Sequence, residues 1–231
     1  MEILLVIAAL GAAIILHELG HGVVAHWLGD ETARRAGRLT LNPLRHIDQM
    51  GSIILPLFLA VGQWLTLGRV AFLFGWAKPV PVDPFALHIG AYRNPRRLMA
   101  LVALAGPAVN FLLALAGGYA LRAAMASPVA AEALIYFIDI NLLLGLFNLI
   151  PLPPMDGGRI AVGLLPLPLA SLLAQAERLG IALVLLALFV LPLALAQFGI
   201  RFDPFGDLIR VVLPVAEQAV LTLTGTPIGS R

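Results

Sequence analysis

The residues best suited to chemistry lie near the start of the chain, where positions 17–21 read His17, Glu18, Leu19, Gly20 and His21. On a helix, side chains four positions apart lie one turn apart on the same face, so the two imidazoles could hold one metal ion. The glutamate lies beside the first histidine and could act as general base toward a water molecule activated by the metal. This spacing predicts a catalytic metal site, although so short a pattern also occurs by chance.

A third ligand must come from elsewhere, because a catalytic zinc usually takes three protein ligands and keeps one position for water. The chain has no cysteine and five histidines, so that ligand is His, Asp or Glu. The candidates are His26, Asp30, Glu31, His46, Asp48, Asp139 and Asp156. Asp156 follows an apolar stretch, inside a Pro- and Gly-rich run over 148–158 that could turn its carboxylate inward. Asp-Gly is also an ordinary turn signal, so spacing alone leaves both interpretations open.

The composition indicates which kind of element must position these residues. Hydrophobic residues make up 60% of the 231 residues and charged residues 12%, against roughly 45–50% and 25% in ordinary soluble domains. A soluble fold of this size could not bury so much apolar surface, whereas lipid can solvate it. The composition therefore predicts an all-α polytopic membrane protein. The chain lacks a long basic run, which argues against nucleic acid as a partner.

Membrane-spanning helices need about 20 mainly apolar residues. The stretches that qualify are 3–28, 51–75, 98–121, 134–150 and 179–199, with a weaker one at 207–224. We therefore expect five to six transmembrane helices. The N-terminal stretch has no basic flank or cleavage pattern, which favours a retained helix over a signal peptide. The polar residues within it are costly in lipid, at about 2.5–3.5 kcal/mol for a charged residue at mid-span, which favours a functional role.

Basic residues suggest how the chain crosses the membrane. Arginine and the single lysine concentrate in 30–50 and 76–97, whereas 122–133 holds one arginine. The positive-inside rule then places the first two segments in the cytoplasm and the third outside. Segment 51–75 must consequently enter and leave on one side, as a re-entrant segment or short hairpin. We expect a multi-pass protein of the cell membrane, with its site toward the cytoplasmic side, where water can reach it.

Three motifs in this order resemble the site-2 protease family of intramembrane zinc metalloproteases. They are residues 17–21, the run from Gly106 to Asn110, and the run from Asn148 to Gly158, and the resemblance covers roughly residues 10–160. The chain is also similar to a compact prokaryotic branch without PDZ or CBS domains, through residues 42–43 and 74–79. The resemblance implies a single integral-membrane protease domain over 1–225. From the residues themselves we expect a short disordered tail at 226–231.

The resemblance also implies roles for single residues. His17, His21 and Asp156 would bind one Zn²⁺ per chain, and Glu18 would activate the water that attacks the peptide bond. Asn148 would help to hold the substrate carbonyl or the oxyanion. The run from Gly106 to Asn110 would pack a central helix near the site, a structural role more than a chemical one.

The implied substrates are transmembrane proteins or peptides, in contact with membrane lipids, and the oligomeric state stays open. Two alternatives have different signatures. An ion-binding transporter would show paired repeat halves with matching broken helices, and no such symmetry is visible. A non-catalytic membrane scaffold would be expected to lack a ligand or the base, and the sequence retains all four residues.

Overall fold

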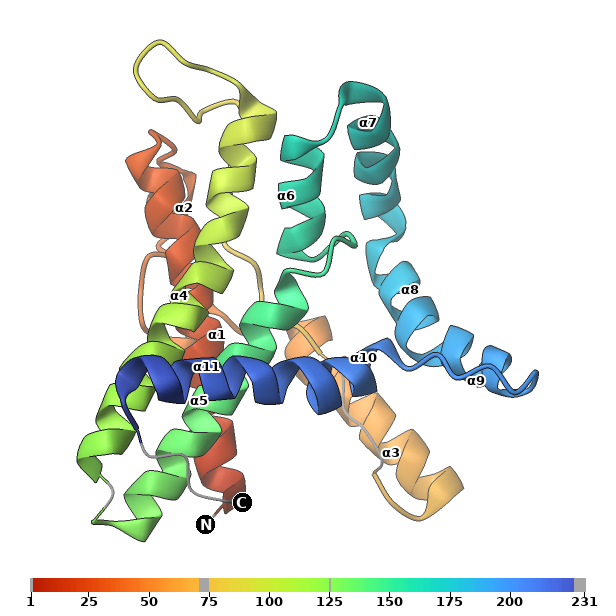
Figure 1. The fold of residues 1–231 in the computed structure, drawn as a ribbon. Helices are drawn as coiled ribbons and strands as arrows, with labels where there is room; N and C mark the ends of the chain where they lie inside the picture. Colours follow the sequence, from red (N-terminus) through yellow and green to blue (C-terminus); the bar gives the residue numbers. More distant parts are fainter. Residues whose placement is uncertain (1, 71–74, 125, 227–231) are drawn as a thin grey trace.

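A computed structural model of the protein describes residues 2–70, 75–124 and 126–226. In these ranges the chain is mainly helical and contains no strand. Four helices are long and apolar enough to cross a membrane, at Ile3–Trp27, Gln49–Thr66, Pro95–Ala124 and Pro128–Asn148. The predicted all-α membrane fold is therefore confirmed. The arrangement of the helices is shown in Figure 1.

Three long helices form the centre of the fold: α1 (Glu2–Trp27), α4 (Pro95–Ala124) and α5 (Pro128–Asn148). Both later helices begin with proline, which suits a first turn where the missing N–H has no helical partner. The Ser127 hydroxyl also caps α5 by accepting from Ala130 N–H. Helix α4 contacts both α1 and α5, and a buried cluster of Ala114, Leu121, Ile138 and Leu142 joins it to α5.

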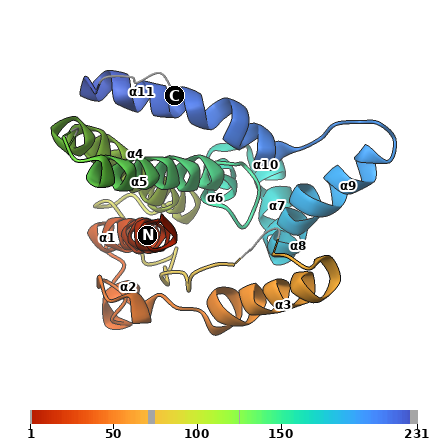
Figure 2. The same ribbon diagram turned by 90° about the horizontal axis from the view of Figure 1, so that it is seen from below.

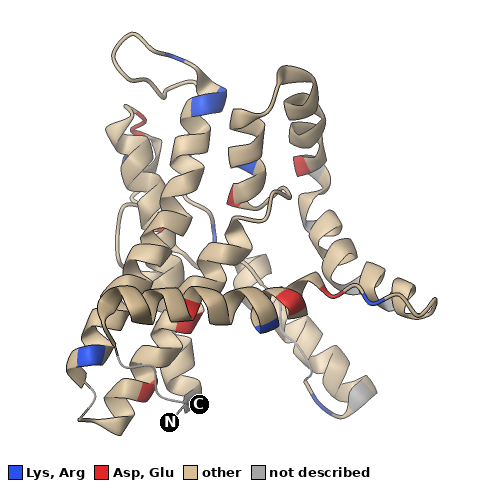
Figure 3. Cartoon of the chain, in the orientation of Figure 1, with Lys and Arg blue, Asp and Glu red and all other residues tan. Residues whose placement is uncertain are grey.

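Charged residues are confined to the ends of α4, the longest of these helices. Arg96 and Arg97 lie in its first turn and Arg122 in its last, with no charged residue between them. Figure 3 shows the same separation of blue positions along this helix. Leu104 and Leu112, by contrast, are exposed on its outer surface. This pattern suits a helix whose outer side faces lipid.

The predicted hairpin segment, 51–75, leaves and returns at the same place, as a hairpin requires. A π-helix, Gln49–Ile54, leads into α3 (Leu55–Leu67), which ends at the left-handed Gly68. Residues at the far end of the segment return to its start, because Trp76 N–H donates to Gly51 O at 3.2 Å and Lys78 N–H donates to His46 O at 2.9 Å. The outward limb is thus one continuous helix, while residues 71–74 lie outside the described ranges.

The two basic segments lie together at the end of α1. The first segment contains α2 (Thr32–Arg35) and a 3₁₀ turn (Pro43–Arg45), and the second lies in the non-helical stretch 75–94 that follows the hairpin. The buried Arg38 donates to the carbonyl groups of Lys78 and Pro79. The buried Asp30 accepts from Asp83 N–H at 2.8 Å. These contacts place both segments at the same end of the bundle, as the charge pattern predicts.

Residues 151–178, which lie between the expected spans 134–150 and 179–199, are largely helical. It contains α6 (Asp156–Leu164) and α7 (Leu167–Ala176), joined at Pro166. Arg96 ties this turn to the start of α4 by donating to Leu165 O at 2.7 Å. Similarly, α4 and α5 extend into the expected loop over 122–133. The sequence interpretation missed these helices because their apolar stretches are too short to stand out as spans.

The predicted span over 179–199 is helical but interrupted. A 3₁₀ turn (Glu177–Leu179) leads to α8 (Gly180–Leu185), a π-helix (Leu186–Val190) and α9 (Leu191–Ala196). Each of the three π-helices described in the chain ends two residues before a proline, at Pro56, Pro192 and Pro214. A proline lacks an N–H and its ring clashes with the carbonyl four positions earlier, so a wider turn accommodates it.

The last elements are α10 (Pro204–Asp207), a π-helix (Leu208–Val212) and α11 (Leu213–Thr224). Helix α11 lies across α4 and α5 instead of alongside them, on the side of the bundle away from α3 (Figures 1 and 2). Val220 anchors it in the buried cluster of α4 and α5. Thr226, in the expected tail, is buried and donates to Gly118 O, and residues 227–231 lie outside the described ranges.

Candidate metal centre

Helix α1 brings the two histidines of the motif together. Their Nε2 atoms lie 3.1 Å apart, and the ring centroids are 4.7 Å apart with the planes at 89°. The His17 side chain is 7% exposed and that of His21 is 12% exposed. The helical spacing therefore does what the sequence predicts, and it points both imidazoles to one place within the bundle.

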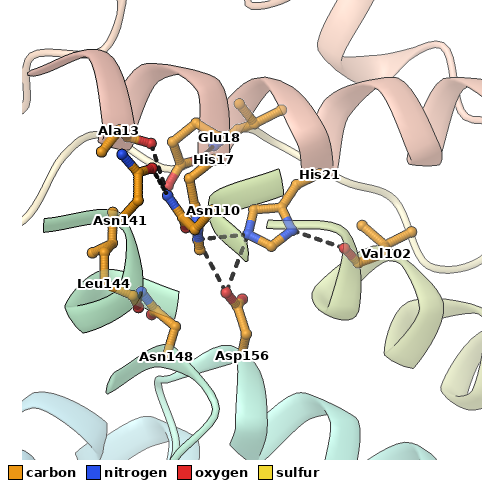
Figure 4. Close-up of polar contacts among 11 residues, drawn as sticks. Ala13, His17, Glu18, His21, Val102, Asn110, Asn141, Leu144, Asn148 and Asp156 are labelled. Atoms are coloured by element: carbon orange, nitrogen blue, oxygen red, sulfur yellow. Dashed lines mark hydrogen bonds and ion pairs between the residues drawn. The ribbon is translucent and has the colours of Figure 1, made fainter. Parts of the chain in front are cut away.

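Asp156 completes the group from the opposite side, as the first residue of α6 (Figure 4). Its Oδ2 atom lies 3.1 Å from His17 Nε2 and 3.3 Å from His21 Nε2, and the carboxylate is buried. The turn over 149–155 positions it by folding tightly against the start of α6. A side chain at Gly157 would overlap the carbonyl groups of Leu149 and Ile150. The close contact between the turn and the start of α6 therefore requires glycine at this position.

The hydrogen bonds around the histidines determine where their protons are. His21 Nδ1 lies 2.8 Å from Val102 O, and His17 Nδ1 lies 2.6 Å from Asn110 Oδ1. Carbonyl oxygens only accept, so both Nδ1 atoms must donate. In neutral imidazoles each Nε2 then carries a lone pair directed toward Asp156, which is how metal-binding histidines are commonly oriented.

His17 Nε2, His21 Nε2 and Asp156 Oδ2 together fit a divalent metal ion. Asp156 Oδ2 is buried without a hydrogen-bond partner and faces two imidazole lone pairs, an arrangement that is repulsive unless a cation lies among them. Tetrahedral zinc bonds of about 2.0–2.1 Å would set ligand atoms about 3.3 Å apart, close to the separations found here. Among the described residues, His17, His21 and Asp156 are the only group of three such side chains that could hold a metal ion.

Helix α4 lies directly against this group at Gly106. A Cβ atom there would lie 2.7 Å from Cε1 of His17 and would overlap the ring of His21. One turn further on, Asn110 is fully buried and contacts His17. Sequence reasoning gave Asn110 a packing role and missed its hydrogen bond to a candidate ligand. The available signal was an amide within an otherwise apolar stretch.

Glu18 lies on the same stretch of α1 and is held by the chain that returns from the hairpin. Its Oε2 atom accepts a hydrogen bond from Val80 N–H at 2.8 Å. The contacts of Arg38 with Lys78 and Pro79 fix the backbone just before Val80. Nothing in the sequence pattern indicates this contact, because it joins positions 62 residues apart.

Asn148 is the last residue of α5, where its Nδ2 donates to Leu144 O at 3.0 Å. The other candidate ligands are engaged elsewhere or stand outside the group. His26 pairs with Glu31 at 3.0 Å, and Asp48 accepts from Gly51 N–H. Asp30 accepts from two backbone N–H groups, and His46 lies 2.9 Å from Thr40 O. Asp139 lies on α5, outside the three-residue group.

The fold and site define the chain as a helical membrane protein with a buried candidate metal centre, and comparisons identify its family. A Bacillus subtilis (strain 168) protein named "Putative zinc metalloprotease YwhC" is 39% identical over 187 residues, covering 77% of this chain and 76% of YwhC. Proteins named "Putative zinc metalloprotease Rip2" are 32% identical in Mycolicibacterium smegmatis, over 193 residues, and 31% identical in Mycobacterium tuberculosis H37Rv, over 194 residues.

These two alignments cover 80% and 81% of this chain, and 66% and 67% of the respective Rip2 proteins. No family model matches the chain, and no solved structure matches it significantly. The chain belongs to the family of these relatives, the site-2 protease family of zinc metalloproteases.

Proposed function

We propose that the protein is an intramembrane zinc metalloprotease that hydrolyses peptide bonds of transmembrane substrates. The observation that carries the proposal is the convergence of His17 Nε2, His21 Nε2 and Asp156 Oδ2 on one place, where Asp156 Oδ2 is buried without a hydrogen-bond partner. Glu18 lies beside His17 on α1. His17, His21 and Asp156 would hold one zinc ion per chain. The family membership and the names of the relatives support the same chemistry.

Zinc bound by these residues would supply a Lewis acid and lower the pKa of water to about 7. Glu18 would take the proton as water attacks the scissile carbonyl, and would then give it to the leaving amine. Val80 N–H helps to hold the Glu18 carboxylate in one orientation. Asn148 would donate its amide to the carbonyl oxygen as charge develops there, after releasing Leu144 O.

The surroundings of the site support a substrate within the membrane. The four long apolar helices support a multi-pass protein of the cell membrane, and the basic segments gathered at one end of α1 would face the cytoplasm. His21 lies six positions before the end of α1, so the site is only about 9 Å from that end along the helix. This depth would let water reach a site that lies among lipid-facing helices.

The first test is metal content combined with cleavage. Protein purified in detergent is expected to contain one zinc per chain by elemental analysis. It should also cut a transmembrane peptide containing Gly, Pro or Asn faster than a poly-leucine span, because a helical peptide bond must unwind before attack. Glu18→Gln should retain zinc and lose cleavage. A wild-type protein that takes up no zinc when zinc is supplied would favour a non-catalytic membrane scaffold.

A further inference from the structure

A line of hydrogen bonds runs from His17 into the interior of α5. His17 Nδ1 contacts Asn110 Oδ1 at 2.6 Å, and Asn110 Nδ2 donates to Asn141 Oδ1 at 2.9 Å. Asn141 Nδ2 in turn donates to Phe137 O at 2.8 Å. Both asparagines are fully buried, each with 0% exposure. The line connects α1, α4 and α5, and Figure 4 shows its two asparagines beside His17.

The line has a fixed direction because it ends on a backbone carbonyl. Phe137 O can only accept, so the NH₂ group of Asn141 must point toward it. The carbonyl oxygen of Asn141 then faces Asn110 and accepts a hydrogen bond from the Asn110 NH₂ group. That in turn directs the Asn110 carbonyl oxygen toward His17. A weaker contact of 3.4 Å, from Asn110 Nδ2 to Ala13 O, favours the same orientation.

The two histidines are therefore oriented by different means. His21 Nδ1 donates directly to Val102 O, a backbone group that cannot change its polarity. His17 Nδ1 instead meets a side-chain amide, which could turn over and present its NH₂ group. A turned amide would require His17 Nδ1 to accept, which would move the proton to Nε2 and remove the lone pair that faces Asp156.

We infer that Asn141 is a positioning residue for the metal centre, which keeps the Asn110 amide turned so that His17 Nε2 stays free to bind the ion. This role rests on the proposed function, because it matters only if the centre binds metal. Asn141 contacts Asn110 and Phe137 O, so it would act on His17 only through Asn110. The competing interpretation, that the two amides merely join three helices, predicts a loss of stability without a specific loss of metal affinity.

The test measures Co²⁺ and Zn²⁺ affinity of the full chain in detergent, with the visible spectrum of bound Co²⁺ as a second readout. Asn141→Leu should weaken metal binding about tenfold, the lower end of the range for groups that hold a metal-binding histidine. Asn141→Asp should bind nearly as wild type, since a protonated carboxyl group offers the same acceptor and donor. Gln63→Leu is the matched control, a buried amide that donates to Leu59 O on α3, away from the metal centre.

The decisive comparison uses the Asn110→Leu background. If Asn141 acts through Asn110, Asn141→Leu causes no further loss of affinity there. An equal further loss, or unchanged affinity in the single variant, would overturn the inference. Thermal unfolding of the metal-free proteins separates a general loss of folding from a loss of binding. A wild-type protein that binds neither ion would refute the proposed function itself, an outcome distinct from wild-type binding that Asn141→Leu leaves intact.

Discussion

Replacing Gly106 with alanine tests the metal centre at its tightest point. The added Cβ would lie 2.7 Å from Cε1 of His17, whereas carbon atoms normally rest about 3.5–4.0 Å apart, so α1 and α4 must separate locally by about 1 Å. Such overpacking typically costs about 1–3 kcal/mol. If that strain is relieved by moving the imidazoles, zinc affinity should fall about 5- to 150-fold.

The assay is a zinc competition titration of detergent-purified protein, together with cleavage of a transmembrane peptide. Gly11→Ala is the control, because a Cβ at that position of α1 meets nothing within 4 Å. It should keep zinc affinity, and it should stabilise the helix by about 0.5–1 kcal/mol, as alanine does relative to glycine. Undiminished zinc affinity in Gly106→Ala would show that α4 does not press on the histidines in solution, and the site geometry would be wrong.

Three further substitutions examine other parts of the site. Asp156→Ala should weaken zinc binding and abolish cleavage, and full zinc occupancy in an elemental analysis would assign the third ligand elsewhere. Asn148→Ala should keep zinc but slow turnover about 10²–10³-fold, as expected for a lost oxyanion donor; unchanged kcat would remove it from the mechanism. Arg38→Gln should loosen the backbone before Val80 and lower kcat more than zinc content, and equal losses of both would point to general unfolding instead.

The fold class could be predicted from the sequence because a surface exposed to lipid requires a high fraction of hydrophobic residues. The chain is 60% hydrophobic, and lipid can solvate so much apolar surface. The long apolar runs become helices there, because a helix satisfies its own backbone hydrogen bonds. The prediction was weaker in the second half of the chain. Pro192 and Pro214 break apolar runs into shorter pieces, and the orientation of α11 depends on which helices it packs against.

The candidate ligands on α1 follow from local geometry, since four residues always make about one helical turn. Spacing alone does not distinguish a metal ligand from an ordinary Asp-Gly turn at Asp156. The resemblance of the motifs indicates the ligand. The sequence by itself therefore determined a membrane-spanning helix that presents two imidazoles and a carboxylate on neighbouring positions.

The tertiary structure decided the rest. Asp156 meets His17 across 139 positions of sequence, Val80 reaches Glu18 across 62, and Asn141 reaches His17 through Asn110 on a third helix. Such contacts depend on how α4, α5 and α6 pack around α1, and a single sequence encodes that packing only through many weak apolar contacts. Local rules therefore identify the residues that could bind a metal, and only packing determines which groups orient them.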